Sequence, residues 1–319
     1  MKGKTKALMA ISVLSVGALA SAGASTFAWL QVNRTVSLAY SSVTMQNRSA
    51  ELSGRLISLD GATATGDDKA QTISGTTSTA SDVSSKDGKT FYSPDWGMEI
   101  GNDKAPVRVN DVSEGGENTY YAEYAFSLTN KGIKTGEAGY NAKTDRPFEV
   151  YLTAGTKVFA HEDTDAAQKK ANEAATSWTR VAILQGANPL TPITSHDDIV
   201  SSELSPILTF ESKPATGVTA DKTKFVQSKN LTSDDKLDLA SYQESDRHYV
   251  LGEEGVFANT GKDSNSTSKN YLNTIASGTT SYYVVRVWLE GTENKDQRSA
   301  QGGKVDINLE INALSQAIA

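Results

Sequence analysis

The strongest constraint on the fold is an alternation of apolar and polar residues that recurs along the chain with a period of two. In the segment 303–312, GKVDINLEIN, one face of an extended chain collects four apolar side chains, namely those of Val305, Ile307, Leu309 and Ile311. Segments 119–128, 147–155 and 281–291 alternate in the same way. This pattern is typical of antiparallel strands with one buried and one solvated face.

The rest of the chain predicts one helix and long loops. Segment 163–178, DTDAAQKKANEAATSW, has a capping residue at Asp163 or Thr164 and then good helix formers, which predicts a short helix near residues 164–176. Three polar stretches, 60–88, 212–247 and 258–280, hold few large apolar side chains and are expected to be mobile loops. The predicted fold is an all-β, jelly-roll-like antiparallel sandwich, with residues 41–319 forming a single domain. The stretch from Gly61 to Gly88 is expected to be dispensable for folding.

The first 28 residues have the features of a secretory signal peptide. Three lysines (Lys2, Lys4 and Lys6) precede an apolar stretch that grades into small residues. Cleavage is expected between Ala28 and Trp29, which makes the predicted mature protein secreted, at the cell surface or outside the cell. An uncleaved segment that stays in the bilayer is the alternative, and it is the only membrane contact that we expect.

Charge and cysteine content exclude several classes of protein. The chain has no cysteine, so disulfides, thiolate zinc sites and cysteine nucleophiles are absent. Removing the three lysines of the signal peptide from the 31 basic residues leaves 28 against 38 acidic ones, a net charge of −10. Such an acidic protein is not expected to bind nucleic acid or anionic lipid.

The sequence contains none of the common catalytic motifs. His161, His196 and His248 are scattered, and none belongs to an HExxH metalloprotease pattern. No GxSxG, P-loop or dinucleotide-binding motif is present, and no pair of carboxylates is singled out for acid–base chemistry. The stretch from Asp263, DSNSTSKNY, resembles a calcium loop but lacks its central glycine and terminal glutamate. We therefore expect no enzyme activity and no cofactor, with calcium as a weak alternative.

The expected mature chain begins directly with a strand, WLQVNRTVSLAY, at residues 29–40. Its even positions carry five apolar side chains, those of Leu30, Val32, Val36, Leu38 and Tyr40, interrupted by Arg34. Exposed in solution, such a strand would be an aggregation hazard. It either pairs within its own sandwich or completes the sandwich of a neighbouring subunit.

Three segments resemble the TasA/camelysin group of Gram-positive surface and biofilm-matrix proteins. GASTFAWLQ at 23–31 is similar to the family's signal-peptide junction, YYAEYAFSLTNKG at 120–132 to a strand and its turn, and GGKVDINLEINAL at 302–314 to the last strand. The resemblance implies a jelly roll whose subunits join when the mature N-terminal strand inserts into the next subunit. It carries the role of donor strand onto Trp29–Tyr40.

Together these features predict a secreted structural subunit of an extracellular filament in a biofilm matrix. The subunit would polymerise with itself, head to tail, by donor-strand complementation, and other cell-surface or matrix components are further candidate partners. Two alternatives remain open: a camelysin-like secreted metalloprotease, and a monomeric surface adhesin or carbohydrate-binding sandwich. The sequence does not indicate which edge of the sandwich would accept the donor strand.

Overall fold

The computed structural model describes most of the chain downstream of Val36. The described residues are 37–47, 52–59, 62–80, 83–95, 108–117, 119–133, 136, 138–139, 146–186, 192–212, 248–251, 270–290 and 300–315. The predicted signal peptide, its cleavage site and most of the stretches 212–247 and 258–280 lie outside these residues, as does the calcium-like stretch from Asp263.

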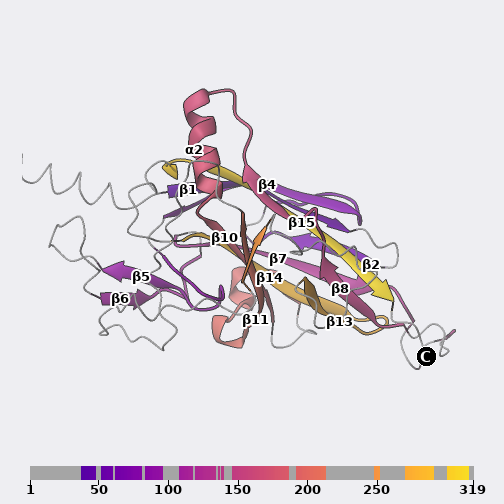
Figure 1. The fold of residues 1–319 in the computed structure, drawn as a ribbon. Helices are drawn as coiled ribbons and strands as arrows, with labels where there is room; N and C mark the ends of the chain where they lie inside the picture. Colours follow the sequence, from indigo (N-terminus) through magenta and orange to yellow (C-terminus); the bar gives the residue numbers. More distant parts are fainter. Residues whose placement is uncertain are drawn as a thin grey trace, which may run out of the picture.

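Most of the described residues form two β-sheets (Figure 1). The seven-stranded sheet has the order β13 (Tyr271–Ile275), β8 (Phe148–Leu152), β15 (Lys304–Ser315), β1 (Ser37–Asn47), β4 (Ala70–Ala80) and β3 (Thr65–Gly66), and β9 (Lys157–Ala160) also pairs with β15. The six-stranded sheet has the order β12 (His248–Leu251), β11 (Ser205–Ser212), β10 (Thr179–Gln185), β14 (Thr280–Leu289), β7 (Ala122–Asn130) and β2 (Leu52–Ile57). The predicted all-β class is confirmed.

The main core lies between the two sheets. The alternating apolar residues predicted for 303–312, from Val305 to Ile311, are fully buried in it, and so are Phe126, Tyr283 and Val285 of the other sheet. The rings of Phe126 and Tyr283 stack with their centroids 4.6 Å apart. Period-two alternation therefore identified the inner faces of these strands correctly.

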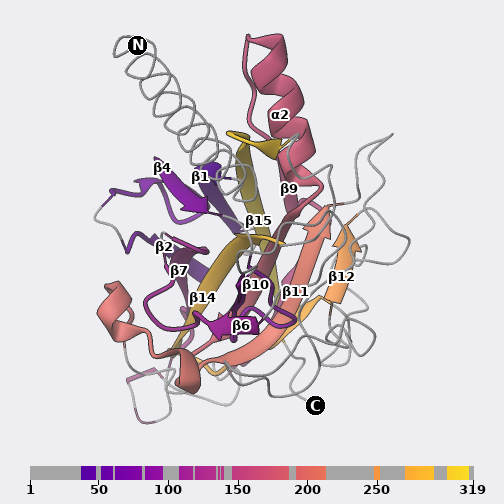
Figure 2. The ribbon, with the colours of Figure 1, turned by 90° about the vertical axis from the view of Figure 1, so that its left-hand side faces the viewer.

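The first and the last strand lie side by side in the seven-stranded sheet (Figure 2). β1 runs parallel to β15, with Tyr40 opposite Val305 and Met45 opposite Leu309, and antiparallel to β4 on its other side. A register shift between Tyr40 and Ser42 marks an irregularity in both pairings. The two ends of the described chain are therefore joined in one sheet.

Among the described residues the one α-helix, α2 (Ala166–Thr176), confirms the predicted helix and projects from the sandwich beside β9 and β15 (Figures 1 and 2). Its N-cap is Asp165, one residue beyond the two candidates from the sequence, and the Asp165 carboxylate accepts a hydrogen bond from the Gln168 N–H at 2.8 Å. Buried Asn172 fastens the helix, because its amide donates to the His161 carbonyl and accepts from the Lys304 N–H, both at 2.7 Å. None of the helices in the described ranges has the length and apolar character needed to span a bilayer.

Two of the predicted loops contain strands. The stretch 60–88 holds β3 and the eleven-residue β4, and the stretch 258–280 holds β13. β4 forms because its threonines and Ile73 fit an extended backbone and because β1 offers it a full-length antiparallel partner. The sequence did not predict this strand because its apolar content is low. Ile73 is the large apolar residue of β4, and it is buried in the core.

The outer face of the six-stranded sheet is buried, although the alternation predicted that it would be solvated. A second apolar cluster covers it, formed by Val83, Phe91, Tyr121, Ile193, Ile199 and Leu204 packed over Ala182, Val284 and Trp288. The covering residues come from segments 83–95, 112–121 and 192–204, which include the short hairpin strand β5 (Tyr92–Asp95), paired with β6 (Arg108–Asp111), and the 3-10 turns η1 (His196–Asp198) and η2 (Ser201–Glu203). The sandwich thus carries a third, irregular layer.

Candidate functional site

The predicted donor strand falls only partly within the described residues. Trp29, Leu30, Val32 and Val36 lie outside them, as does Ala28. The backbones of Leu38 and Tyr40 belong to β1, opposite Thr79 and Thr77 of β4. The strand β1 therefore crosses the expected boundary between donor strand and sandwich at residue 40.

The upstream end of β1 extends past its parallel neighbour. The register between β1 and β15 begins at Ala39 and Lys304, whereas the register with β4 begins at Ser37 and Ala80. At Ser37 the strand is consequently flanked by β4 and has passed the first residue of β15. The alternating sequence that leads back to Trp29 enters β1 at this end of the sheet.

Of the four strands that end the two large sheets in the described residues, β2 is the longest, although β3 covers only Gln71 and Thr72 of its neighbour β4. The six-stranded sheet ends in β2, with six residues, and in β12, with four; the seven-stranded sheet ends in β13, with five, and in β3, with two. A pocket of about 570 Å³ follows β2 from Ser53 to Ser58. On the core side this pocket is lined by Ala62 and Ala64, and on the outer side by Ile193 and Tyr282.

One side chain already pairs with the edge of β2. The Gln71 amide of β4 donates to the Gly54 carbonyl at 3.2 Å and accepts from the Leu56 N–H at 2.7 Å. These two groups point away from β7, and the amide binds them much as the peptide group of a neighbouring strand would. The edge of β2 thus presents hydrogen-bonding groups to the pocket in the orientation that strand addition uses.

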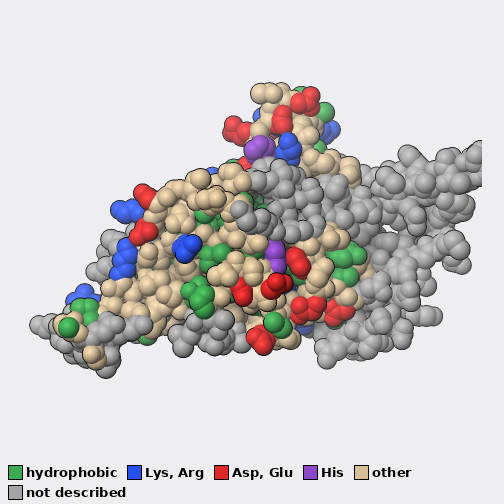
Figure 3. Space-filling model, turned by 180° about the vertical axis from the view of Figure 1, so that it is seen from behind, with side chains coloured by type: hydrophobic (Ala, Val, Ile, Leu, Met, Phe, Trp, Pro, Cys, Tyr) green, Lys and Arg blue, Asp and Glu red, His purple; other side chains and the backbone are tan. Residues whose placement is uncertain are grey.

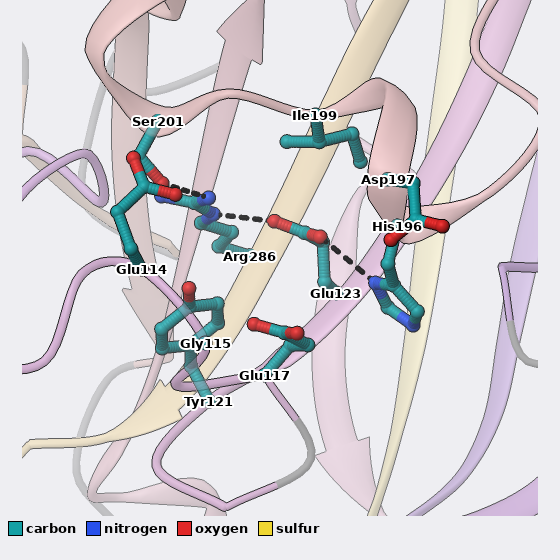
Figure 4. Close-up of a pocket in the computed structure, with 10 residues that line it drawn as sticks. All are labelled: Glu114, Gly115, Glu117, Tyr121, Glu123, His196, Asp197, Ile199, Ser201 and Arg286. Atoms are coloured by element: carbon teal, nitrogen blue, oxygen red, sulfur yellow. Dashed lines mark hydrogen bonds and ion pairs between the residues drawn. The ribbon is translucent and has the colours of Figure 1, made fainter.

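A second pocket, of about 180 Å³, lies at the outer layer of the six-stranded sheet (Figure 4). Its carboxylates come from Glu114, Glu117, Glu123 and Asp197, and they surround Tyr121, His196 and Arg286. Figure 3 shows acidic side chains gathered on one face of the molecule. The arrangement combines carboxylates, an imidazole and a guanidinium, so its protonation states decide what chemistry it can support.

Buried charge pairs organise this second pocket. The Arg286 Nε donates to Glu123 Oε2 at 2.7 Å, and the His196 Nδ1 lies 3.0 Å from Glu123 Oε1. Arg286 also donates to the Ser201 hydroxyl at 2.7 Å and lies over the Tyr121 ring, 4.8 Å from its centroid. Both oxygens of Glu123 are thus engaged, which leaves this carboxylate poorly suited to act as a general base.

The strand register explains how these charges meet. Glu123 of β7 stands directly opposite Arg286 of β14, and Arg180 of β10 stands opposite Glu211 of β11. The second pair is closed at 2.9 Å, and Arg180 also lies 3.6 Å from Glu290. Glu290 in turn accepts from Trp288 Nε1 at 2.7 Å. The buried outer face is therefore lined by cross-strand pairs of opposite charge.

Tyr121 reinforces the covering layer rather than offering a reactive phenolate. Burial raises the pKa of its phenol, and the hydroxyl donates to the Ser113 carbonyl at 2.6 Å. The same carbonyl accepts from the Ser201 hydroxyl at 3.0 Å. The pocket's polar groups thus hold segments 112–121 and 192–204 against the sheet.

The two histidines whose side chains the structure describes, His161 and His196, do not converge. His161 Nδ1 lies 2.9 Å from Asp306 Oδ2, and the other carboxylate oxygen of Asp306 accepts a hydrogen bond from the Ser42 hydroxyl. His196 lies in the second pocket. The side chain of His248 is outside the described residues. Within the described residues, no group of three or more His, Asp or Glu side chains could hold a metal ion. Trp178 and Trp288 are buried, the first in the main core and the second in the outer cluster.

Sequence reasoning missed the buried charges because Glu123, Arg180 and Arg286 occupy positions that the alternation assigned to solvent. A signal was present, since Trp288 shares the face of Arg286 and no solvated face favours a tryptophan. No protein-family model matches the chain, and no curated protein or solved structure shows significant similarity to it.

Proposed function

We propose that the protein is a secreted structural subunit of an extracellular filament and that it polymerises head to tail through its mature N-terminal strand. The donor in this proposal is the segment Trp29–Val36, because Ser37 and the residues after it pair within their own sheet. The observation that carries the proposal is the position of β1. It stands between β15 and β4, and its alternating sequence continues upstream past the start of β15.

A central strand is a strong anchor for such a donor. A force applied to the segment Trp29–Val36 would be transmitted to β1, which pairs with β15 on one side and with β4 on the other. Head-to-tail exchange is heterologous and does not close, so it propagates as a fibre. The resemblance to the TasA/camelysin group supports the same reading, including a jelly-roll architecture and a place in the biofilm matrix.

Burial of the apolar side chains of the donor would stabilise the joint. Burying Leu30, Val32 and Val36 at about 1.5–3 kcal/mol each would contribute on the order of 5–9 kcal/mol before ordering costs. New backbone hydrogen bonds along the strand would add to this. Cleavage after Ala28 would serve as the trigger, because it frees the end of the donor.

The proposal is tested by charge substitutions in the donor of purified mature protein. Val32→Asp and Val36→Asp should abolish filaments seen by negative-stain electron microscopy, because a buried, unpaired carboxylate costs several kcal/mol. Circular dichroism should show that both variants remain folded.

The matched control is Thr35→Asp, on the opposite face of the strand, which should still form filaments. Filaments that survive both valine substitutions would refute the donor role. Misfolded monomers would indicate instead that the strand belongs to its own sandwich. A parent protein that stays monomeric would favour the adhesin alternative, and chelator-sensitive casein hydrolysis would favour the metalloprotease.

A further inference from the structure

The edge strand β2 lies beside a pocket of the described residues. We infer that this edge is the acceptor for the segment Trp29–Val36 of a second copy of the chain. This inference rests on the proposed function and adds to it the surface at which the subunits join.

A strand edge and an adjoining pocket occur together at β2. β2 has six residues, and the donor segment 29–36 has eight. At roughly 3.4 Å per residue they span about 20 Å and about 27 Å, so the donor is long enough to cover the whole of β2. The edge strands β12, β13 and β3 are shorter, and the pocket of about 570 Å³ follows β2.

The two faces of β2 match the two faces of the donor. Leu52 and Leu56 point into the main core. Ala62 and Ala64 line the pocket, are partly buried and pack against this core. Arg55 is exposed on the other face. A strand added to β2 would place Leu30, Val32 and Val36 on the core side, and Arg34 on the same side as these three.

The same register would place Gln31, Asn33 and Thr35 on the outer side. There they would join Ser53 and Arg55, which line that side of the pocket together with Ile193 and Tyr282. The donor thus presents mostly apolar residues to the core side, with Arg34 as the exception, and mostly polar residues to the outer side, with Trp29 as the exception.

Gln71 acts as the occupant of this edge until the donor arrives. Its amide satisfies the Gly54 carbonyl and the Leu56 N–H, so the free subunit does not leave these groups unpaired at the pocket. An incoming strand would replace both bonds with backbone bonds, an exchange that costs little because the number of hydrogen bonds is conserved. The side chain thereby limits unspecific pairing at the edge without blocking the specific partner.

Engineered disulfides test the inference, since the natural chain has no cysteine to interfere. The outward groups of β2 belong to Gly54 and Leu56, so Arg55 would form a non-hydrogen-bonded pair with an antiparallel donor. Cα atoms in such pairs lie about 4.5 Å apart, within the range of a disulfide. Arg55→Cys is therefore combined with Gln31→Cys, Asn33→Cys or Thr35→Cys in three separate proteins.

Oxidised filaments of at least one of these three proteins should give a ladder of covalent oligomers on a non-reducing gel. Two controls test which face of the donor lies beside Arg55 and whether β2 is the edge that accepts it. Arg55→Cys with Val32→Cys joins opposite faces and should give no ladder. In the second control, each of the three donor cysteines is combined in turn with Thr274→Cys, an exposed position on β13, and no ladder is expected from any of these proteins.

The outcomes separate the two proposals. Filaments that cross-link through Thr274, or that cross-link in none of the three Arg55 combinations, would overturn the assignment of β2 and leave the filament function intact. A cysteine-free parent that forms no filaments would overturn the proposed function itself.

Discussion

At the residue scale, the main result is that charged side chains lie inside the protein. Glu123 and Arg286 are almost completely buried, and they pair with each other across β7 and β14 beneath the covering segments. A buried pair contributes little net stability compared with apolar residues, but each partner depends strongly on the other. The covering layer therefore depends on these specific charge contacts in addition to its apolar cluster.

Removing one member of this pair should be costly. Arg286→Met should lower the free energy of unfolding by about 3–5 kcal/mol, because it strands the Glu123 carboxylate in the interior. Adding Glu123→Gln to the same protein should recover part of the loss. Urea unfolding at neutral pH measures both changes.

The control uses an exposed pair, Lys131 and Asp68, whose side chains are 47% and 61% exposed and lie 3.1 Å apart. Lys131→Met should change the free energy of unfolding by about 0–1 kcal/mol. Equal losses for the Lys131 and Arg286 variants would contradict the structural role given to the buried pair.

Asp198 provides a pH-dependent test of the turn that carries His196. Its carboxylate accepts hydrogen bonds from the N–H and hydroxyl groups of Thr194 and Ser195, and the bonds from Thr194 lower the pKa of Asp198 most, from 3.8 to about 2. A lowered folded-state pKa means that the stabilisation is complete above about pH 4 and is lost as the pH falls through 2.

Asp198→Asn should therefore be less stable than the parent at pH 7, and the difference should shrink near pH 2. Urea midpoints of the two proteins at both pH values give the comparison, and groups that titrate in both proteins cancel. A difference that stays constant with pH would show that the charge of Asp198 does not matter to the turn.

At the element scale, the sequence identified strands wherever one face is strongly apolar, as in β7, β14 and β15. It failed for β4, in which Ile73 is the large side chain that reaches the core, because pairing with β1 and not burial defines that strand. It also failed for the outer face of the six-stranded sheet. The residues that cover this face come from distant loops, and no local pattern reports contacts of such long range.

The stretch Gly61–Gly88, predicted to be dispensable, should prove essential through β4. Ile73 is 5% exposed and packs in the main core opposite Val43 in the β1–β4 register. Ile73→Ala should lower the free energy of unfolding by about 2–5 kcal/mol, measured in urea. The neighbouring exposed residue supplies the control, since Ser74→Ala should change it by no more than about 0.5 kcal/mol.

At the scale of the whole molecule, the class of fold followed from alternation and composition, whereas the arrangement of the candidate site did not. The pocket beside β2 depends on Gln71 from β4 and on Ile193 from a covering segment, which are far apart in sequence. The donor was recognisable because it is one continuous segment. The proposed acceptor is assembled from several segments that are distant in the sequence, so only the structure could reveal it.

The pairing of the first strand with the last also constrains when the protein can fold. Tyr40 lies beside Val305, so the centre of the seven-stranded sheet cannot form until the ribosome has synthesised β15. Contacts between such distant parts of a chain form slowly, because a long loop must close before they stabilise anything. A chain with this topology stays incomplete throughout translation, which would suit the proposed secretion, because export channels pass unfolded chains.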